Sequence, residues 1–274
     1  MVDGRAYPLH WLILTNAGAS NLDEQQALIM PVLAWFHRQM TNPIVVLGDR
    51  EFHSVQLAQW LSEQGVYYVL REKKDLQVKG QNGQYASLES RNIYPGIKQL
   101  IAPVVVVKSK GFGAGNLAIR WKRKYRGKGD REGWYLRSNL DEVDEIIDGY
   151  GKRMGIEEMF RDAKKGGYNL EECQAKPVRL NALILVISIA YTVSSLKGKA
   201  IKRLRQDKYV GRQRSFKKNV TKNSNFKLGL YGQLFCDLPQ RLMMLGHKLM
   251  ELTPGKRLFY WRGERAKRKI QEAF

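Results

Sequence analysis

Hydrophobic and polar positions along the first seventy residues predict three strands and two helices. Two short apolar runs have no polar face, which is typical of strands that are buried on both sides. In other stretches the apolar residues recur every three or four positions, as on one face of a helix. We therefore predict strands at Arg5–Leu14, Ile44–Leu47 and Val66–Leu70, and helices at Leu22–Met40 and Ser54–Gln64. This alternating order indicates an α/β layer, whose ligand crevice lies at the carboxyl ends of its strands.

Glycines interrupt residues 72–140, and the apolar segments between them predict an antiparallel β insertion. Its strands are expected at Val104–Lys108, Leu117–Arg126 and Gly133–Leu140, and the last of them should return to the main sheet. Helical patterns dominate afterwards, at Asp141–Lys165, from Pro177 onward and at Pro239–Leu252. We expect the first part of the α/β domain at 1–71, the insertion at 72–140, the rest of the domain at 141–200 and a basic helical tail at 201–274.

Four polar residues share one face of the segment 141–165 if that segment is a continuous helix. Tyr150, Arg153, Glu157 and Lys164 are spaced three, four and seven apart, so at about 100° per residue they fall within about 60° of one another. One carboxylate, two cations and a phenol on one face suit a metal ligand flanked by phosphate-binding groups. A salt-bridged, solvated helix face has the same pattern and is the commoner explanation for an arbitrary charged helix.

The net charge weighs against that simpler explanation. The chain has 47 Lys and Arg against 26 Asp and Glu, a net charge of +21, which argues for a polyanionic partner. Leu196–Phe274 alone holds 21 Lys and Arg against 5 Asp and Glu, and Lys197–Lys222 is expected to be a basic loop or arm. No run reaches the ~18 apolar residues of a membrane span. We therefore expect a nucleic-acid partner and no membrane contact.

The candidate metal ligands are carboxylates. The two cysteines and four histidines show no zinc spacing, and free cysteines without a secretory signal suit a cytoplasmic protein. Asp49 follows a buried strand at its carboxyl end, where an Asp is most often a turn or cap residue. Paired with Glu157, it matches a need of phosphoryl transfer on DNA, which uses two divalent ions about 3.5–4 Å apart held by a few carboxylates.

Two motifs carry a resemblance to a known family. Segment 45–52, Val-Val-Leu-Gly-Asp-Arg-Glu-Phe, resembles the second-aspartate motif of DDE transposases of the insertion-sequence type. The spacing Tyr150-x2-Arg153-x3-Glu157-x6-Lys164 is similar to the Y-R-E-K signature of the bacterial family that includes the transposase of transposon Tn-five. Residues 5–11 and 167–172 also resemble its flanking sequence, so the resemblance covers nearly the whole chain to about residue 200.

The resemblance implies a fold and a reaction. The fold is a ribonuclease H-like mixed sheet with helices on both faces, interrupted by the antiparallel insertion. The reaction is DNA cleavage and strand transfer at the ends of an insertion sequence, with double-stranded DNA as partner and a homodimer on that DNA. Two Mg²⁺ or Mn²⁺ ions are the implied cofactors, and Asp49 and Glu157 would be the catalytic metal ligands.

The resemblance also implies which residues contact DNA. Tyr150, Arg153 and Lys164 would hold phosphates near the cleavage point, where Arg and Lys suit charge-assisted bonds. Further candidates are Arg50 of the aspartate motif and the basic, aromatic patch at Trp121, Lys122 and Arg123. For this patch a solvated strand face is about as good an explanation. Whether Trp121 or Trp134 contacts a hairpin intermediate stays open.

The front of the chain departs from the family pattern. A ribonuclease H-like sheet carries its first catalytic Asp on a first strand, followed by two more strands, whereas we predict one strand before residue 22. We therefore expect an N-terminally truncated and inactive transposase. The alternatives are a non-catalytic DNA-binding remnant of a transposase and another ribonuclease H-like nuclease, which the Y-R-E-K spacing disfavours.

Overall fold

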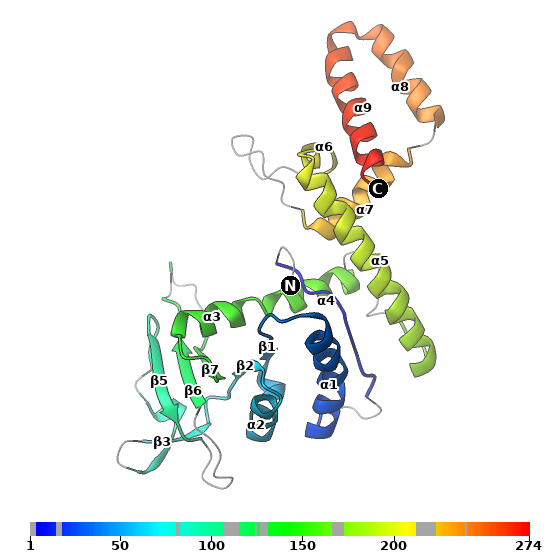
Figure 1. The fold of residues 1–274 in the computed structure, drawn as a ribbon. Coiled ribbons are helices and arrows are strands. Elements are labelled where there is room, and N and C mark those ends of the chain that lie inside the picture. The colour runs from blue at the N-terminus through cyan, green and yellow to red at the C-terminus, as the bar shows by residue number, and fades with distance from the viewer. Residues whose placement is uncertain are drawn as a thin grey trace. The chain divides into compact units, whose positions relative to one another are not determined.

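The computed structural model describes residues 4–14, 18–80, 83–91, 93–106, 115–123, 125–126, 131–165, 173–211, 223–238 and 240–274. The chain divides into two compact units (Figure 1). The first unit ends at Glu157, and the second covers Glu158–Phe274.

The first unit is built on a five-stranded mixed sheet with the strand order β1-β2-β7-β6-β5. The first pair is parallel and the other three pairs are antiparallel. The strands are β1 (Val45–Gly48), β2 (Tyr67–Arg71), β5 (Lys98–Val104), β6 (Gly115–Arg120) and β7 (Trp134–Ser138). A separate pair, β3 (Gln77–Lys79) and β4 (Tyr85–Ser87), forms a small second sheet that the sequence pattern did not predict.

Helices cover both faces of the main sheet. On one face, Tyr68 and Leu70 of β2 pack in a cluster with side chains of α1 (Leu22–Gln39) and α2 (Val55–Glu63). On the other face, Val69 packs with side chains of α3 (Val143–Gly151). Neighbouring residues of a strand point to opposite faces, so the unbroken apolar run of β2 follows from this double cover. The predicted mixed α/β fold with helices on both faces is confirmed.

The predicted first strand, Arg5–Leu14, is wrong. Residues 6–14 form neither a helix nor a strand. Pro8 cannot donate a ladder hydrogen bond, and the segment is tied instead by the Ala6 N–H, which donates to the Gly155 carbonyl at 3.2 Å. Among the described residues nothing pairs with the outer edge of β1.

Other predicted boundaries also change. α1 starts at Leu22, as predicted, after a capping box between Asn21 and Glu24, and it runs through Pro31 without dividing. The strand predicted at Val104–Lys108 lies earlier, because β5 ends at Val104, and residues 107–108 lie outside the described part of the chain. The strand predicted at Leu117–Arg126 ends early, at Arg120, where β6 loses its partner on β7.

The second unit is helical. After α4 (Met154–Lys165), which runs across the division between the units, come α5 (Pro177–Arg203), α6 (Asp207–Val210), α7 (Asn225–Cys236), α8 (Gln240–Leu252) and α9 (Arg257–Glu272). Tyr191 of α5 stacks on Phe226 of α7 with ring centroids 5.1 Å apart. The first part of the predicted basic arm at Lys197–Lys222 is the end of α5, which runs to Arg203 and whose Ile201 is fully buried. Residues 212–222 lie outside the described part of the chain.

The length and composition of α5 are sufficient for a membrane span, and 17% of its apolar window is buried. A core helix of a soluble protein can have the same length and apolar composition. α5 also packs tightly against α7 through glycines on both helices, so its apolar character is a weak sign of a membrane.

Candidate functional site

Asp49 lies directly after β1, at the carboxyl end of the parallel pair. Its Oδ1 accepts a hydrogen bond from the Glu51 N–H at 3.1 Å and so caps the short 3₁₀ turn Arg50–Phe52. Gly48 allows this turn to lie close to β2, because a Cβ there would be 2.6 Å from Phe52 Cβ and 2.7 Å from Leu70 Cδ2. The cap explains the local conformation, but it leaves Oδ2 of Asp49 facing away from the turn for another partner.

The segment expected to be one continuous helix is two helices. α3 ends at Gly151 and α4 begins at Met154, with a turn at Lys152 and Arg153. Gly149 and Gly151 weaken the helix at this point, and the Arg153 N–H instead donates to the Tyr150 carbonyl at 2.9 Å. The predicted continuous helix is therefore wrong: Tyr150 lies on α3, Arg153 lies in the turn, and Glu157 and Lys164 lie on α4.

Arg153 brings the two predicted carboxylates together. Its NH2 nitrogen lies 2.6 Å from Asp49 Oδ2, and its NH1 nitrogen lies 2.7 Å from Glu157 Oε1. The Arg153 side chain is only 16% exposed. Burial alone would lower the pKa of Arg153, and the hydrogen bond to Glu157 and the charge of Asp49 outweigh it, so the pKa is raised.

The other two residues of the Y-R-E-K spacing lie in different surroundings. Tyr150 is 3% exposed and packs edge-to-face on Trp134, with ring centroids 5.1 Å apart. Burial raises the pKa of its phenol. Lys164 is exposed on α4, in the second unit and two helical turns after Glu157. Tyr150 thus helps to hold Trp134, whereas Lys164 is an exposed side chain of α4.

A cleft of about 610 Å³ lies beside Glu157. It is lined by four cations, Arg71, Arg120, Lys122 and Arg131, together with Trp134 and acidic residues. Lys122 lies over the Trp134 ring, 5.6 Å from its centroid. Of the predicted basic patch, Lys122 lines this cleft, whereas Trp121 is half-buried and Arg123 is exposed.

Glu132 gathers two arginines at the same cleft. It pairs with Arg50, a predicted DNA-binding residue, and lies 2.9 Å from the NH2 nitrogen of Arg71. Burial and the nearby Arg71 lower the pKa of Arg50. The site residues that the sequence did not single out are Arg71, Arg120, Arg131 and Glu132. Arg71 could have been found from the sequence, because it lies at the carboxyl end of β2. Asp49 lies at the carboxyl end of the neighbouring strand β1, so the two residues are expected at the same edge of the sheet.

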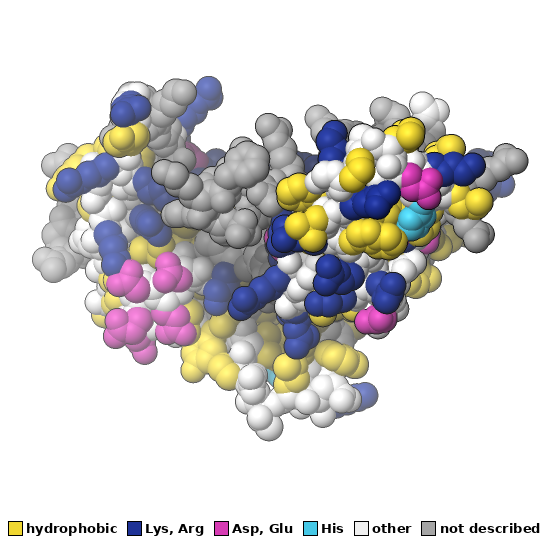
Figure 2. Space-filling model, turned by 90° about the horizontal axis from the view of Figure 1, so that it is seen from above, with side chains coloured by type: hydrophobic (Ala, Val, Ile, Leu, Met, Phe, Trp, Pro, Cys, Tyr) yellow, Lys and Arg dark blue, Asp and Glu magenta, His cyan; other side chains and the backbone are white. Residues whose placement is uncertain are grey.

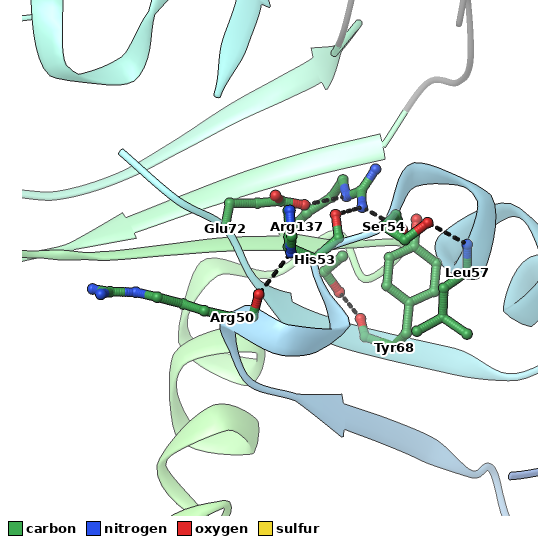
Figure 3. A network of polar contacts seen from close by, with 8 residues as sticks. Arg50, His53, Ser54, Leu57, Tyr68, Glu72 and Arg137 are labelled. Atoms are coloured by element: carbon green, nitrogen blue, oxygen red, sulfur yellow. Dashed lines mark hydrogen bonds and ion pairs between the residues drawn. The ribbon is translucent and has the colours of Figure 1, made fainter. Parts of the chain in front are cut away.

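A buried ion pair between Arg137 and Glu72 lies next to the residues that follow the Asp49 turn (Figure 3). Arg137 of β7 has its Nε 2.7 Å from Oε1 of Glu72, and their side chains are 5% and 0% exposed. The NH2 group of Arg137 donates to the carbonyls of His53 and Ser54 at 3.0 and 2.9 Å. Burial raises the pKa of Glu72 to about 7, although Arg137 lowers it. Arg137 therefore links the sheet to the turn that follows Asp49.

The donor chemistry of Asp49 and Glu157 fits a hard divalent ion. Both side chains offer carboxylate oxygens, which Mg²⁺ and Mn²⁺ prefer, and both oxygens already converge on one cation, the Arg153 guanidinium. Within the described residues, no group of three or more His, Cys, Asp or Glu side chains could hold a metal ion. Asp49 and Glu157 thus form a pair of carboxylates rather than a larger group in this part of the chain.

The arrangement as a whole suits a phosphodiester substrate. Two acidic side chains meet at the carboxyl end of a parallel strand pair, and a cleft lined by cations and by the half-buried Trp134 begins next to them. Comparison with curated proteins gives no match. The family model "Transposase DDE domain" matches residues 1–193, more than half of the sequence, and the chain therefore belongs to the DDE transposase family.

Proposed function

We propose that this chain is an insertion-sequence transposase of the Y-R-E-K type, with Asp49 and Glu157 as its catalytic carboxylates. The observation that carries the proposal is the double contact of Arg153, which joins a strand-end Asp to a helix-borne Glu. DDE transposases act on DNA with divalent metal ions, and Mg²⁺ or Mn²⁺ suits these oxygen ligands. When bound, such ions stabilise charge on the attacking and leaving oxygens of a phosphodiester.

The chain's own residues would bind and orient the DNA. Arg71, Arg120, Lys122 and Arg131 give the cleft a positive lining for the phosphates of a transposon end. Trp134 offers a face on which a base can stack, and Tyr150 holds it from behind. Figure 2 shows Lys and Arg side chains spread over the helices of the second unit, among hydrophobic ones. This surface gives a further phosphate-binding region whose contribution falls with salt.

We further propose that the chain alone does not cleave DNA. Cleavage with two metal ions needs a few carboxylates, and the described residues bring two together. The outer edge of β1, next to Asp49, is unpaired in this part of the chain. A strand that carries a third carboxylate would have its place there, as in the ribonuclease H-like pattern.

Asp49→Ala is expected to abolish metal-dependent nicking of a transposon end by a form of the protein that has been supplied with a first catalytic Asp. DNA affinity without metal ions should change less than about twofold, because Asp49 is an anion and holds no phosphate. Nicking of labelled duplex and a filter-binding titration measure the two effects. Asp144→Ala, which removes an exposed carboxylate of α3, is the matched control and should cleave normally. Cleavage by Asp49→Ala would refute the site, and cleavage by the unmodified chain would refute its inactivity.

The second candidate function is DNA binding without catalysis. The surplus of Lys and Arg in the second unit favours it, since that charge binds duplex DNA whether or not the metal site works. The two functions differ in a restored form with a first catalytic Asp: the transposase cuts, whereas the binding protein stays inactive.

The exposed face of α8 supports a homodimer. Leu242, Leu245, Leu249 and Leu252 follow one another at intervals of three, four and three residues and are 52–79% exposed. This spacing is that of a coiled-coil seam, which is complementary to a second copy of itself. α8 has 13 residues, less than two heptads, so the seam is short and we expect weak, concentration-dependent association.

Leu245→Glu should therefore shift the protein to a monomer, because it places a charge in the middle of the seam. Sedimentation velocity over a range of concentrations, with and without duplex DNA, measures this shift. Met244→Glu is the matched control, since Met244 is 57% exposed on the same helix but lies outside the seam. If both variants sediment as the parent protein does, α8 is not the interface.

A further inference from the structure

Arg153 occupies the position between two carboxylates where a metal cation would be needed. Each of its terminal nitrogens binds a different carboxylate, at 2.6 Å for Asp49 and 2.7 Å for Glu157. These are charge-assisted hydrogen bonds from one planar guanidinium. In this state the guanidinium offsets part of the negative charge that two adjacent carboxylates would otherwise carry unshielded.

The break between α3 and α4 holds Arg153 in this position. The Arg153 N–H donates to the Tyr150 carbonyl at 2.9 Å, and the Arg153 carbonyl accepts from the Ile156 N–H at 2.9 Å. The backbone is therefore anchored on both sides, whereas the long side chain can change rotamer without unfolding either helix. The guanidinium of Arg153 can therefore leave its two carboxylate partners while the backbone of the turn stays in place.

The same guanidinium cannot keep both contacts when a divalent ion uses the same oxygens. Arg153 and a dication bound to Asp49 and Glu157 would be like charges close together, which repel each other. The residues that flank the turn, Gly151 and Met154, line the cation-rich cleft. DNA lying in this cleft would bring phosphates within reach of a released Arg153 side chain.

We propose that Arg153 is a positioning residue that holds Asp49 and Glu157 together in the metal-free protein, gives them up to a divalent ion, and then binds a DNA phosphate. This inference rests on the proposed metal site at these two carboxylates. It adds an exchange of partners to that site. Because such coupling is reciprocal, Mn²⁺ strengthens DNA binding through Arg153, and DNA strengthens Mn²⁺ binding.

The first test measures Mn²⁺ binding to the complete chain without DNA, by electron paramagnetic resonance of the free ion. Arg153→Gln should bind Mn²⁺ about tenfold more tightly than the parent, because the ion no longer displaces two charged hydrogen bonds. Arg153→Lys should fall between them, since one ammonium cannot fork to both carboxylates. Arg161→Gln removes an arginine that pairs with Glu158 on the same helix, and it should leave Mn²⁺ affinity unchanged.

The second test measures the salt dependence of duplex binding with and without Mn²⁺. The quantity compared is the slope of log affinity against log salt concentration, which is negative. In Mn²⁺ this slope should be steeper for the parent than for Arg153→Gln by about 0.9, the value for one phosphate contact. Without Mn²⁺ the two slopes should agree. A slope difference that is the same in both conditions would mean that Arg153 binds phosphate without an exchange, and would overturn the inference.

The outcomes separate this inference from the proposed function. If Asp49→Ala weakens Mn²⁺ binding but Arg153→Gln leaves it unchanged or weaker, the metal site stands and the exchange is refuted. If neither the parent nor Arg153→Gln binds Mn²⁺, both the metal site and the exchange fail. Circular dichroism melts that match the parent show that a variant is folded, and Arg153→Lys provides a second variant if Arg153→Gln is not.

Discussion

Gly198→Ala is expected to force helices α5 and α7 apart and to destabilise the second unit by about 3 kcal/mol or more. A Cβ at Gly198 would overlap the Asn225 carbonyl oxygen and lie 2.8 Å from the Gly229 backbone nitrogen. Its neighbours are backbone atoms, which cannot turn aside as a flexible side chain can. The reciprocal glycine, Gly229, meets the carbonyl of Ser194 in the same way, so the two helices touch backbone to backbone at this crossing.

Hydrogen exchange followed by mass spectrometry measures this effect locally. Amides of α5 and α7 should lose protection in Gly198→Ala, whereas amides of the five-stranded sheet should keep it. Gly263→Ala is the matched control, because Gly263 lies in α9 with open space around its Cα. That change should stabilise its helix by about 1 kcal/mol, the difference between Gly and Ala in a helix. Equal protection in both variants would show that the crossing is looser than the structure has it.

Arg137→Met is expected to destabilise the first unit by about 3–5 kcal/mol, the usual cost of removing one partner of a buried ion pair. The change leaves Glu72 buried without its cation and removes the donor to the carbonyls of His53 and Ser54. Because these carbonyls follow the Asp49 turn, the variant should also loosen that turn. Urea unfolding measures the loss of stability, and hydrogen exchange at residues 50–58 measures the loosening.

The control for Arg137→Met is Lys98→Met on β5. Lys98 pairs with Asp144 at the surface, with the two side chains 48% and 71% exposed, so its loss should cost less than about 1 kcal/mol. The double variant Glu72→Leu with Arg137→Met should recover part of the stability, because it leaves no buried charge. If Arg137→Met costs no more than Lys98→Met, the buried pair does not stabilise the fold.

The pH dependence gives a second check on the same ion pair. The folded pKa of Glu72 is about 7, above its ordinary value of 4.5. The folded chain therefore holds a proton that the unfolded chain has lost, and the free energy of unfolding falls as the pH rises from about 4.5 to about 7. In Arg137→Met the pKa rises further because the nearby cation is gone, so this fall should continue above pH 7.

The hydrophobic pattern predicted an element correctly where the residues of that element are sufficient to specify its structure. Ile44–Leu47 and Val66–Leu70 were recognised as strands because they have no polar face. Val69 and Leu70 are fully buried, whereas Val45 is exposed because β1 lies at the edge of the sheet. The helix at Leu22 was recognised by the recurrence of its apolar residues, and in the structure it begins after a capping box at Asn21. Arg5–Leu14 was misjudged for the opposite reason: its residues favour a strand, but a strand also needs a partner, and local sequence does not show one.

The candidate site was only partly visible for the same physical reason. Asp49 and Glu157 could be named from their positions at a strand end and on a helix, and the match of residues 1–193 shows that the chain belongs to the DDE transposase family. The Y-R-E-K spacing suggested a single helical stripe, whereas Gly149 and Gly151 end the helix before Arg153. Glu132 and Arg137 were missed because their partners, Arg71 and Glu72, lie far away along the chain.

Two strands and two helices of the α/β layer, the two carboxylates and the strong positive charge could be read from the sequence alone, because hydrophobic period, strand-end position and residue type are local properties. The position of Arg153 between those carboxylates, the support of the Asp49 turn by Arg137 and the contact of Gly198 with Gly229 appear only in the folded chain. Each of these depends on residues that the fold brings together, and their contact distances follow from packing that no single segment encodes.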